Sequence, residues 1–265
     1  MPRSHRRLLL LIIGLLSLAN LVIAQSTSRL HPAKGQSRMQ TAAAQRRANP
    51  ALDRQLGRYY EDNQRLLAQP APPDRVVFLG DSITDFWKLP EYFPGKPYVN
   101  RGISGQATSQ MLLRMFPDVI DLHPAVVIVK AGTNDIAYYT GPETLTAAGQ
   151  NIRAMTELAR LHGIRVILGS IIPVSDYSGT KRTVERSPAH IVEWNMWLRG
   201  YATGADVEFA DYYSVMVDEQ GMLRKDCSDD GVHPNARGYT LMAPLAEAAI
   251  QRVLQRPTSA PCGQK

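Results

Sequence analysis

The hydrophobic residues between positions 75 and 210 gather in short runs separated by longer amphipathic stretches. Runs of about four to eight residues that are rich in Val, Ile and Leu are typical of strands buried on both faces of a parallel sheet. They occupy residues 75–79, 125–129, 165–172 and 207–210. Because helical patterns alternate with these runs, the sequence predicts an α/β fold with helices on both faces of one sheet.

Two long helices are predicted in the folded part of the chain, over residues 142–162 and 235–254. Gly163 follows the first of them directly and is a typical helix stop signal. No internal repeat divides the pattern. We therefore expect one folded domain over residues 74–256 and a C-terminal tail over residues 257–265.

A shorter helix is expected ahead of that domain. Asn49 is a common N-cap residue, and Pro50 suits the first helical position. Apolar residues then recur at helical spacing: Leu52, Leu56, Tyr59 and Tyr60. Residues 25–47, before this helix, have almost no large apolar side chains and cannot offset the entropy lost on ordering. Residues 25–73 are therefore predicted to form a flexible spacer with a short leading helix.

The first 24 residues have the pattern of a secretory signal peptide. Basic residues near the start precede an apolar run over residues 8–24, and small residues mark a cleavage point before Gln25. The alternative is an uncleaved anchor, because the run approaches the lower limit of a membrane-spanning helix. No cysteine precedes Cys227, which excludes a lipid-modified cysteine at the start of the mature chain. We expect a secreted or periplasmic protein without stable membrane anchoring after cleavage.

Composition narrows the class of protein. A chain of 265 residues with 44% hydrophobic residues can bury one sizeable core. The net charge of +6 falls to +3 without the three arginines of the signal segment, and no basic cluster stands out beyond Arg46 and Arg47 in the N-terminal tail. Nucleic acid is therefore not an expected partner. Cys227 and Cys262 either form a disulfide or remain two free thiols, and the oligomeric state stays open.

Polar residues follow the predicted strands, and parallel sheets carry their functional groups at the carboxyl ends of the strands. Ser82 comes directly after the first strand, in the sequence Gly80-Asp81-Ser82. At a strand-to-helix turn its hydroxyl and backbone N–H would both face the open end of the sheet, which suits a nucleophile. The same residues are also an ordinary turn and N-cap signal.

Two further loops offer hydrogen-bond donors. The loop predicted over residues 100–105 ends in Gly105, whose backbone N–H a substrate oxygen could approach without an obstructing side chain. The loop over residues 132–135 follows the second strand, and the amide of Asn134 could reach the same oxygen. Each loop, taken alone, is equally well an ordinary turn.

A base for Ser82 is found just before the last helix. A serine hydroxyl needs a base with a pKa near neutrality and a third group that orients the base. His233 and Asp230 fit these roles, since a carboxylate three residues before a histidine can fold back onto its ring. Asp229 and Asp226 are less suitable substitutes on spacing.

These motifs occur in one order along the chain, and together they resemble the SGNH hydrolases, also called the GDSL esterase family, over residues 76–254. The nucleophile block falls on Gly80, Asp81 and Ser82, and the second block falls on Gly105. The third block, Gly-x-Asn-Asp, falls on residues 132–135. The last block, Asp-x-x-His-Pro, falls on Asp230, His233 and Pro234.

The resemblance implies a flavodoxin-like three-layer α/β/α sandwich with a five-stranded parallel sheet. It also implies an acyl-serine mechanism, with Ser82, His233 and Asp230 as the triad. The oxyanion would be held by the backbone N–H groups of Ser82 and Gly105 and by the amide of Asn134. No cofactor or metal is implied, and the chain lacks the common metal, phosphate and dinucleotide motifs.

The substrate is expected to be a carboxylic ester of a small molecule or a glycan, with a short acyl group such as acetyl. No long apolar insertion separates the motifs, and aromatic residues near them could contact a sugar: Trp87, Tyr138 and Tyr139. Core packing is the alternative role for these rings. The alternative functions are a lysophospholipase or thioesterase and a non-catalytic glycan- or lipid-binding module of the same fold.

Overall fold

A computed structural model describes residues 55–138 and 142–256, which belong to a compact unit that begins at Arg54. Its centre is a five-stranded sheet in which every pairing is parallel, in the order β2-β1-β3-β4-β5. The strands are β1 (Val76–Gly80), β2 (Tyr98–Gly102), β3 (Val126–Lys130), β4 (Arg165–Gly169) and β5 (Glu208–Ala210). The predicted α/β fold with a five-stranded parallel sheet is confirmed.

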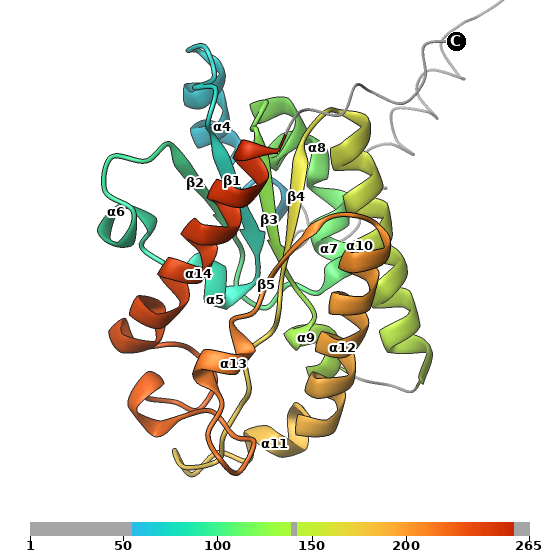
Figure 1. The fold of residues 1–265 in the computed structure, drawn as a ribbon, viewed down its shortest axis with the longest axis vertical. Coiled ribbons are helices and arrows are strands. Elements are labelled where there is room, and N and C mark those ends of the chain that lie inside the picture. The colour runs from blue at the N-terminus through green and yellow to red at the C-terminus, as the bar shows by residue number, and fades with distance from the viewer. Residues whose placement is uncertain (1–54, 139–141, 257–265) are drawn as a thin grey trace, which may run out of the picture. The chain divides into compact units, whose positions relative to one another are not determined.

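Helices connect the strands and cover the sheet (Figure 1). The longer ones are α4 (Tyr60–Leu67), α10 (Pro142–Leu161), α12 (Pro188–Gly204) and α14 (Ala236–Gln255). The shorter ones are α5 (Ser82–Asp85), α6 (Leu89–Tyr92), α7 (Thr108–Leu113), α8 (Met115–Asp118), α9 (Thr133–Ala137), α11 (Arg182–Glu185) and α13 (Tyr213–Met216), with 3-10 turns at Ile120–Leu122 and Lys225–Cys227. The helices α10 and α14 agree with the two long helices predicted from the sequence, within one residue at each end.

Two hydrophobic layers enclose the sheet, because successive strand residues point to opposite faces. Val77 and Leu79 of β1 pack with residues of α10 and α12, whereas Val76 and Phe78 pack with residues of α14. Every residue of β1 and β3 is buried. The carboxyl ends of these two central strands lead directly into α5 and α9 (Figure 1).

The edge strand β2 was missed by the sequence analysis, which predicted a loop over residues 100–105. Its first three residues are only partly buried, so it lacks a continuous apolar run. Two polar residues occupy its centre and are held by side-chain hydrogen bonds: Asn100 donates to the Thr84 carbonyl (2.6 Å), and Arg101 donates to Asn63 of α4 (2.7 Å). β4 ends at Gly169, three residues before the predicted end.

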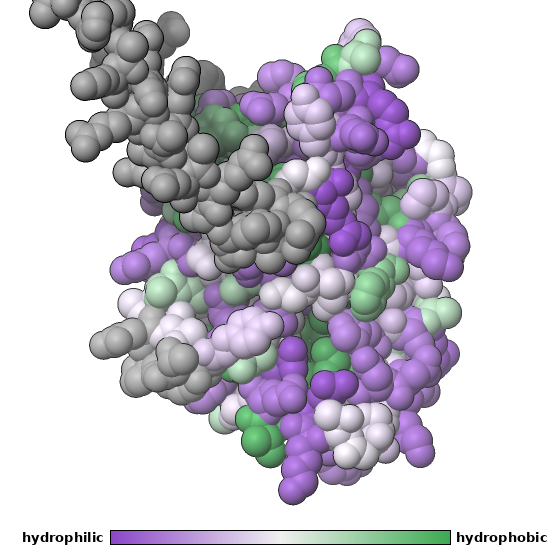
Figure 2. Space-filling view, turned by 180° about the vertical axis from the view of Figure 1, so that it is seen from behind, coloured by the Kyte–Doolittle hydropathy of each residue, from purple (hydrophilic) through white to green (hydrophobic). Residues whose placement is uncertain are grey.

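Several expectations fall on residues that the structure does not describe. They are the signal segment at 1–24, the flexible spacer at 25–47, the helix start at Asn49, and the tail at 257–265 with Cys262. Cys227 is described and is buried. Within residues 55–138 and 142–256, none of the helices has the length and apolarity needed to cross a membrane. On the face that Figure 2 shows, hydrophobic residues form small separate patches among hydrophilic ones.

Candidate active site

Three side chains form a hydrogen-bonded series at the carboxyl ends of the strands. The Nε2 atom of His233 lies 2.9 Å from the Oγ atom of Ser82, although the two residues are 151 positions apart. The Nδ1 atom of His233 lies 2.7 Å from the Oδ2 atom of Asp230. An ionised carboxylate can only accept, so the neutral ring donates from Nδ1 and leaves Nε2 to accept the serine proton.

The carboxylate of Asp230 is held in place by the loop that carries it. Its Oδ1 atom accepts hydrogen bonds from the backbone N–H groups of Val232 (2.9 Å) and His233 (2.8 Å). Burial by itself raises the pKa of Asp230, but these bonds and the bond from the His233 ring lower it to about 2. Asp230 is therefore ionised at any pH at which the protein is expected to work.

The other acidic residues considered from the sequence lie elsewhere. Asp226 pairs with Arg224 and Arg237, and the Oδ1 atom of Asp229 accepts a hydrogen bond from Asn235 at 3.2 Å. Neither carboxylate is bonded to His233. Of the three carboxylates considered, that of Asp230 is the one that bonds to the His233 ring.

The connection from β4 to α12, residues 170–187, supports the loop of His233. Ser175 donates its backbone N–H to the Gly231 carbonyl at 2.9 Å, and the Tyr177 hydroxyl donates to the Ser228 carbonyl at 2.7 Å. Gly231 has φ +79°, and a Cβ atom there would lie 2.1 Å from the Ser175 carbonyl oxygen. A glycine is therefore required at this contact.

Ser82 is the first residue of α5 and is presented by a short cap. The Asp81 side chain accepts the backbone N–H of Ile83 at 2.9 Å, which ends β1 and starts α5. On the outer side, the ring of Phe86 lies 5.2 Å from the ring of His233, and Phe86 is 52% exposed. The sequence analysis did not single out Phe86, because an isolated aromatic residue in a sequence does not indicate that its ring lies beside a functional site.

The loop of Gly105 follows β2 and is fixed by a carboxylate. The Oδ2 atom of Asp85 accepts the backbone N–H of Ser104 (3.1 Å) and its hydroxyl (2.6 Å). The other oxygen of Asp85 accepts from Arg58 at 2.6 Å. Gly105 has φ +80°, and the space that a Cβ atom would occupy is open. A substrate oxygen can therefore approach this stretch of backbone.

Two neighbouring residues of α9 tie this helix to the same loop. Asn134 is 4% exposed, and its Nδ2 atom donates to the Gln106 carbonyl at 3.0 Å. The carboxylate of Asp135 accepts the hydroxyl of Thr108 at 2.6 Å, and burial raises its pKa. Asn134 and Gly105 are consequently held on adjoining segments of the chain.

Charged residues that the sequence analysis did not single out lie beneath the site. Lys130, the last residue of β3, is 2% exposed, and its Nζ atom lies 4.0 Å from the Oδ1 atom of the buried Asp81. Burial lowers the pKa of Lys130. Arg114 is fully buried and donates to the Gly80 carbonyl at 3.0 Å. In the sequence, the one sign of these buried charges was a lysine at the end of an apolar strand.

The aromatic residues expected to face a substrate have different positions. Trp87 is 2% exposed and packs against Phe78 and Tyr239 in the core, so the expectation of substrate contact was wrong for it. A large ring is buried there because it fills the space between β1 and α14. Tyr138, just after α9, is 62% exposed, and Tyr139 lies outside the described residues.

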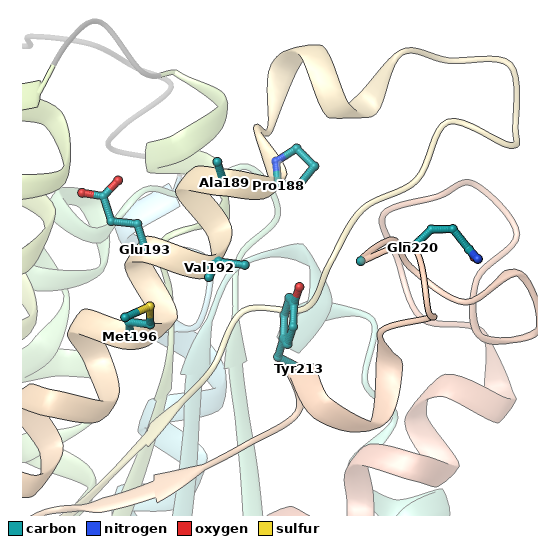
Figure 3. A pocket seen from close by; sticks show the side chains of 8 residues that line it. Pro188, Ala189, Val192, Glu193, Met196, Tyr213 and Gln220 are labelled. Carbon is teal, nitrogen blue, oxygen red and sulfur yellow. The ribbon is translucent and has the colours of Figure 1, made fainter.

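A separate apolar hollow of about 500 Å³ lies between α12 and α13. Figure 3 shows Tyr213 between the helix that carries Val192 and the segment that carries Gln220. None of the candidate residues lines it. In the described part of the chain, no group of three or more His, Cys, Asp or Glu side chains is arranged to hold a metal ion.

Known proteins resemble this chain in sequence and fold. The pattern of the GDSL-like lipase/acylhydrolase family matches residues 78–241. A crystal structure of a GDSL-like lipase from Bacteroides thetaiotaomicron is 38% identical, with a TM-score of 0.67, and the match covers 74% of this chain and 97% of that chain. An acetylxylan esterase from Geobacillus stearothermophilus is 20% identical, with a TM-score of 0.53 over 67% of this chain and 94% of that chain, and shares the fold.

One curated relative is an uncharacterized lipoprotein, YqeF, of Bacillus subtilis. It is 30% identical over 142 residues, which are 46% of this chain and 53% of that protein. The match thus spans about half the length of the relative.

Proposed function

The chain belongs to the GDSL-like lipase/acylhydrolase family and is an ester hydrolase, and on that premise we propose that Ser82 is the nucleophile of a secreted serine esterase. The observation that carries the proposal is the hydrogen-bonded series from Asp230 through His233 to Ser82. An unactivated serine hydroxyl is a weak nucleophile, and a neutral imidazole at this distance is the base that it needs.

In the proposed reaction, the Oγ atom of Ser82 attacks the ester carbonyl while its proton moves to Nε2 of His233. The tetrahedral intermediate collapses, and His233 gives the proton to the departing alcohol, which leaves an acyl group on Ser82. Water then repeats the sequence and releases the acid. Because hydrogen bonds keep the pKa of Asp230 at about 2, its carboxylate remains charged and stabilises the imidazolium formed in each half-reaction.

The proposed oxyanion donors are the backbone N–H groups of Ser82 and Gly105 and one N–H of the Asn134 amide. The open space at Gly105 and the short distance between Asn134 and the Gly105 loop support this set. Such donors matter most where charge develops, so they act on kcat more than on KM. We expect Asn134→Ala to lower kcat for p-nitrophenyl acetate by about 10²-fold with a smaller change in KM.

The test of the nucleophile is Ser82→Ala assayed with p-nitrophenyl acetate. We expect a loss of at least about 10⁴-fold in kcat with an unchanged melting temperature, because Ser82 contributes little to the core. Ser214→Ala is the matched control, since Ser214 lies on α13 and donates its hydroxyl to Asp211 at 2.7 Å, away from His233. A fluorophosphonate should label wild type and Ser214→Ala but not Ser82→Ala. Turnover retained by Ser82→Ala would refute the assignment.

We propose a preference for acetyl and other short acyl groups, with a carbohydrate as a suitable alcohol. Apolar side chains next to Ser82, such as Ile83 and Trp87, are used in core packing. Residues 176–187 of the β4–α12 connection are at least partly exposed, so they supply no buried apolar wall. The exposed rings of Phe86 and Tyr138 are suited to the flat face of a sugar or a small alcohol.

A p-nitrophenyl ester series tests this preference. Full burial of each added CH₂ is worth about 0.8 kcal/mol, or about fourfold in kcat/KM. We expect kcat/KM to fall beyond the shortest acyl groups instead of rising by that factor, and acetylated sugars to be turned over. A maximum at long chains or on lysophospholipid would favour the lysophospholipase or thioesterase alternative. Binding of esters without turnover would favour a non-catalytic module.

We also propose that the enzyme acts outside the cytoplasm. The signal-like pattern of residues 1–24 supports this, and so does the match to a relative named as a lipoprotein. N-terminal sequencing of exported protein should give a start near Gln25. Retention of Met1 on membrane-bound protein would favour an uncleaved anchor.

A further inference from the structure

The amide of Asn134 is held from both ends, and the second contact comes from a distant segment. Its Nδ2 atom donates to the Gln106 carbonyl at 3.0 Å. Its Oδ1 atom accepts from the Nη2 atom of Arg186 at 3.4 Å, across 52 positions of sequence. The reversed amide would place Oδ1 against a carbonyl oxygen and Nδ2 against a guanidinium, so both neighbours select one orientation.

That orientation leaves the second N–H of Asn134 available for a substrate oxygen. The Arg186 side chain is 14% exposed, so solvent screens its positive charge only partly. A cation bonded to an amide oxygen draws electron density from the nitrogen, and hydrogen bonds in such a chain strengthen one another. The N–H groups of Asn134 therefore become better donors.

We propose that Arg186 is a positioning residue that fixes and polarises the Asn134 amide for oxyanion stabilisation. This rests on the proposed role of Asn134. Arg186 itself does not contact the reacting atoms in this scheme and acts through the amide.

The neighbouring Arg182 provides a matched control. Both arginines approach the same oxygen of Glu185: Nη1 of Arg186 lies at 2.9 Å and Nη1 of Arg182 at 3.7 Å. Of the two, the guanidinium of Arg186 is the one that bonds to Asn134. Replacing either arginine removes one positive charge beside Glu185, but only one replacement removes the contact with the amide.

The experiment is a double-mutant cycle in the full chain with p-nitrophenyl acetate as substrate. Arg186→Met should lower kcat by about tenfold with little change in KM, less than the about 10²-fold expected for loss of the donor itself. In the Asn134→Ala background, Arg186→Met should have no further effect on kcat. Arg186→Lys should retain more activity than Arg186→Met, and Arg182→Met should match wild type.

Each other outcome overturns the inference. An equal loss from Arg186→Met in both backgrounds would mean that Arg186 acts independently of Asn134. A change confined to KM for negatively charged esters would make Arg186 a direct binding residue for substrate. An unchanged kcat in Asn134→Ala would instead refute the proposed oxyanion role of Asn134. The Asn134→Ala variant thus distinguishes failure of the proposed function from failure of the role inferred for Arg186. If Arg186→Met does not fold, the same cycle with Arg186→Lys decides.

Discussion

Removal of the buried guanidinium of Arg114 is the most severe single perturbation that the structure suggests near the site. Arg114 is fully buried. It donates to four acceptors: Gln106 Oε1 (2.6 Å), the Arg101 carbonyl (2.7 Å), the Gly80 carbonyl (3.0 Å) and Asp118 Oδ2 (3.1 Å). The substitution Arg114→Met keeps much of the side-chain volume and removes all of these bonds.

The expected loss follows from the burial of the partners. Asp118 is 1% exposed, and removing one partner of a buried ion pair costs about 3–5 kcal/mol. The Gly80 carbonyl keeps the backbone N–H of Ile103 at 3.0 Å. A buried acceptor that is left without a donor, such as Oε1 of Gln106, adds about 1–3 kcal/mol, although such costs are not fully additive. We therefore expect Arg114→Met to lower the free energy of unfolding by about 5 kcal/mol or more. Typical domains have about 5–15 kcal/mol in total, so this variant should be barely folded.

Urea unfolding followed by circular dichroism measures the effect, with two comparison variants. Arg65→Met removes a similar short-range pair with Asp62, but these side chains are 78% and 40% exposed, so the change should stay below about 1 kcal/mol. Arg114→Lys keeps the charge and reaches fewer acceptors, and should lie between the two. A loss below about 2 kcal/mol for Arg114→Met, with an unchanged slope against urea, would refute the reasoning.

Three further predictions follow from single contacts. Gly132→Ala would place a Cβ atom 2.2 Å from Nε1 of Trp194 at φ +124°, and should lower the melting temperature by at least about 5 °C. Gly200→Ala, in α12 with open space around the added Cβ atom, should not lower it. The pKa of Asp230 is lowered to about 2 in the folded protein. The difference in unfolding free energy between wild type and Asp230→Asn, measured with urea, should therefore be full above about pH 4 and vanish towards pH 2. A difference that grows on acidification would contradict this. Phe86→Ala should raise KM for short esters and change the unfolding free energy by less than about 1 kcal/mol, because the ring is half exposed.

The sequence predicted the strands whose residues are all buried. All residues of β1 and β3 are buried, so their composition is apolar almost throughout. β2 lies at the sheet edge, and the buried side chain of Arg101 is satisfied by Asn63 and Asp62, which precede it by 38 and 39 positions. No local pattern reveals that such a polar residue is in a strand, because its partners come from a separate helix.

The contacts of the candidate site also differ in whether the sequence could predict them. Asp230 and His233 are three residues apart, so their contact was predictable from spacing, and Ser82 was marked by its place after a strand. The bond from Arg186 to Asn134 joins segments that follow different strands, and the sequence has no signal for it. Trp87 was misjudged because an aromatic residue near a motif is equally suited to the core, and only the packing of α14 decides between the two.

Under the proposed mechanism, the separation of 151 positions between Ser82 and His233 also determines when activity appears during folding. The nucleophile strand is central, and β2, β3, β4 and β5 all follow it along the chain. His233 lies beyond the last strand, so a chain still emerging from the ribosome has the proposed nucleophile long before it has the proposed base. Contacts between distant residues form slowly, because a long loop must close before they are made. Hydrolysis therefore reports on folding of the chain through the loop of His233, and a chain truncated before Asp230 should be inert even with its sheet assembled.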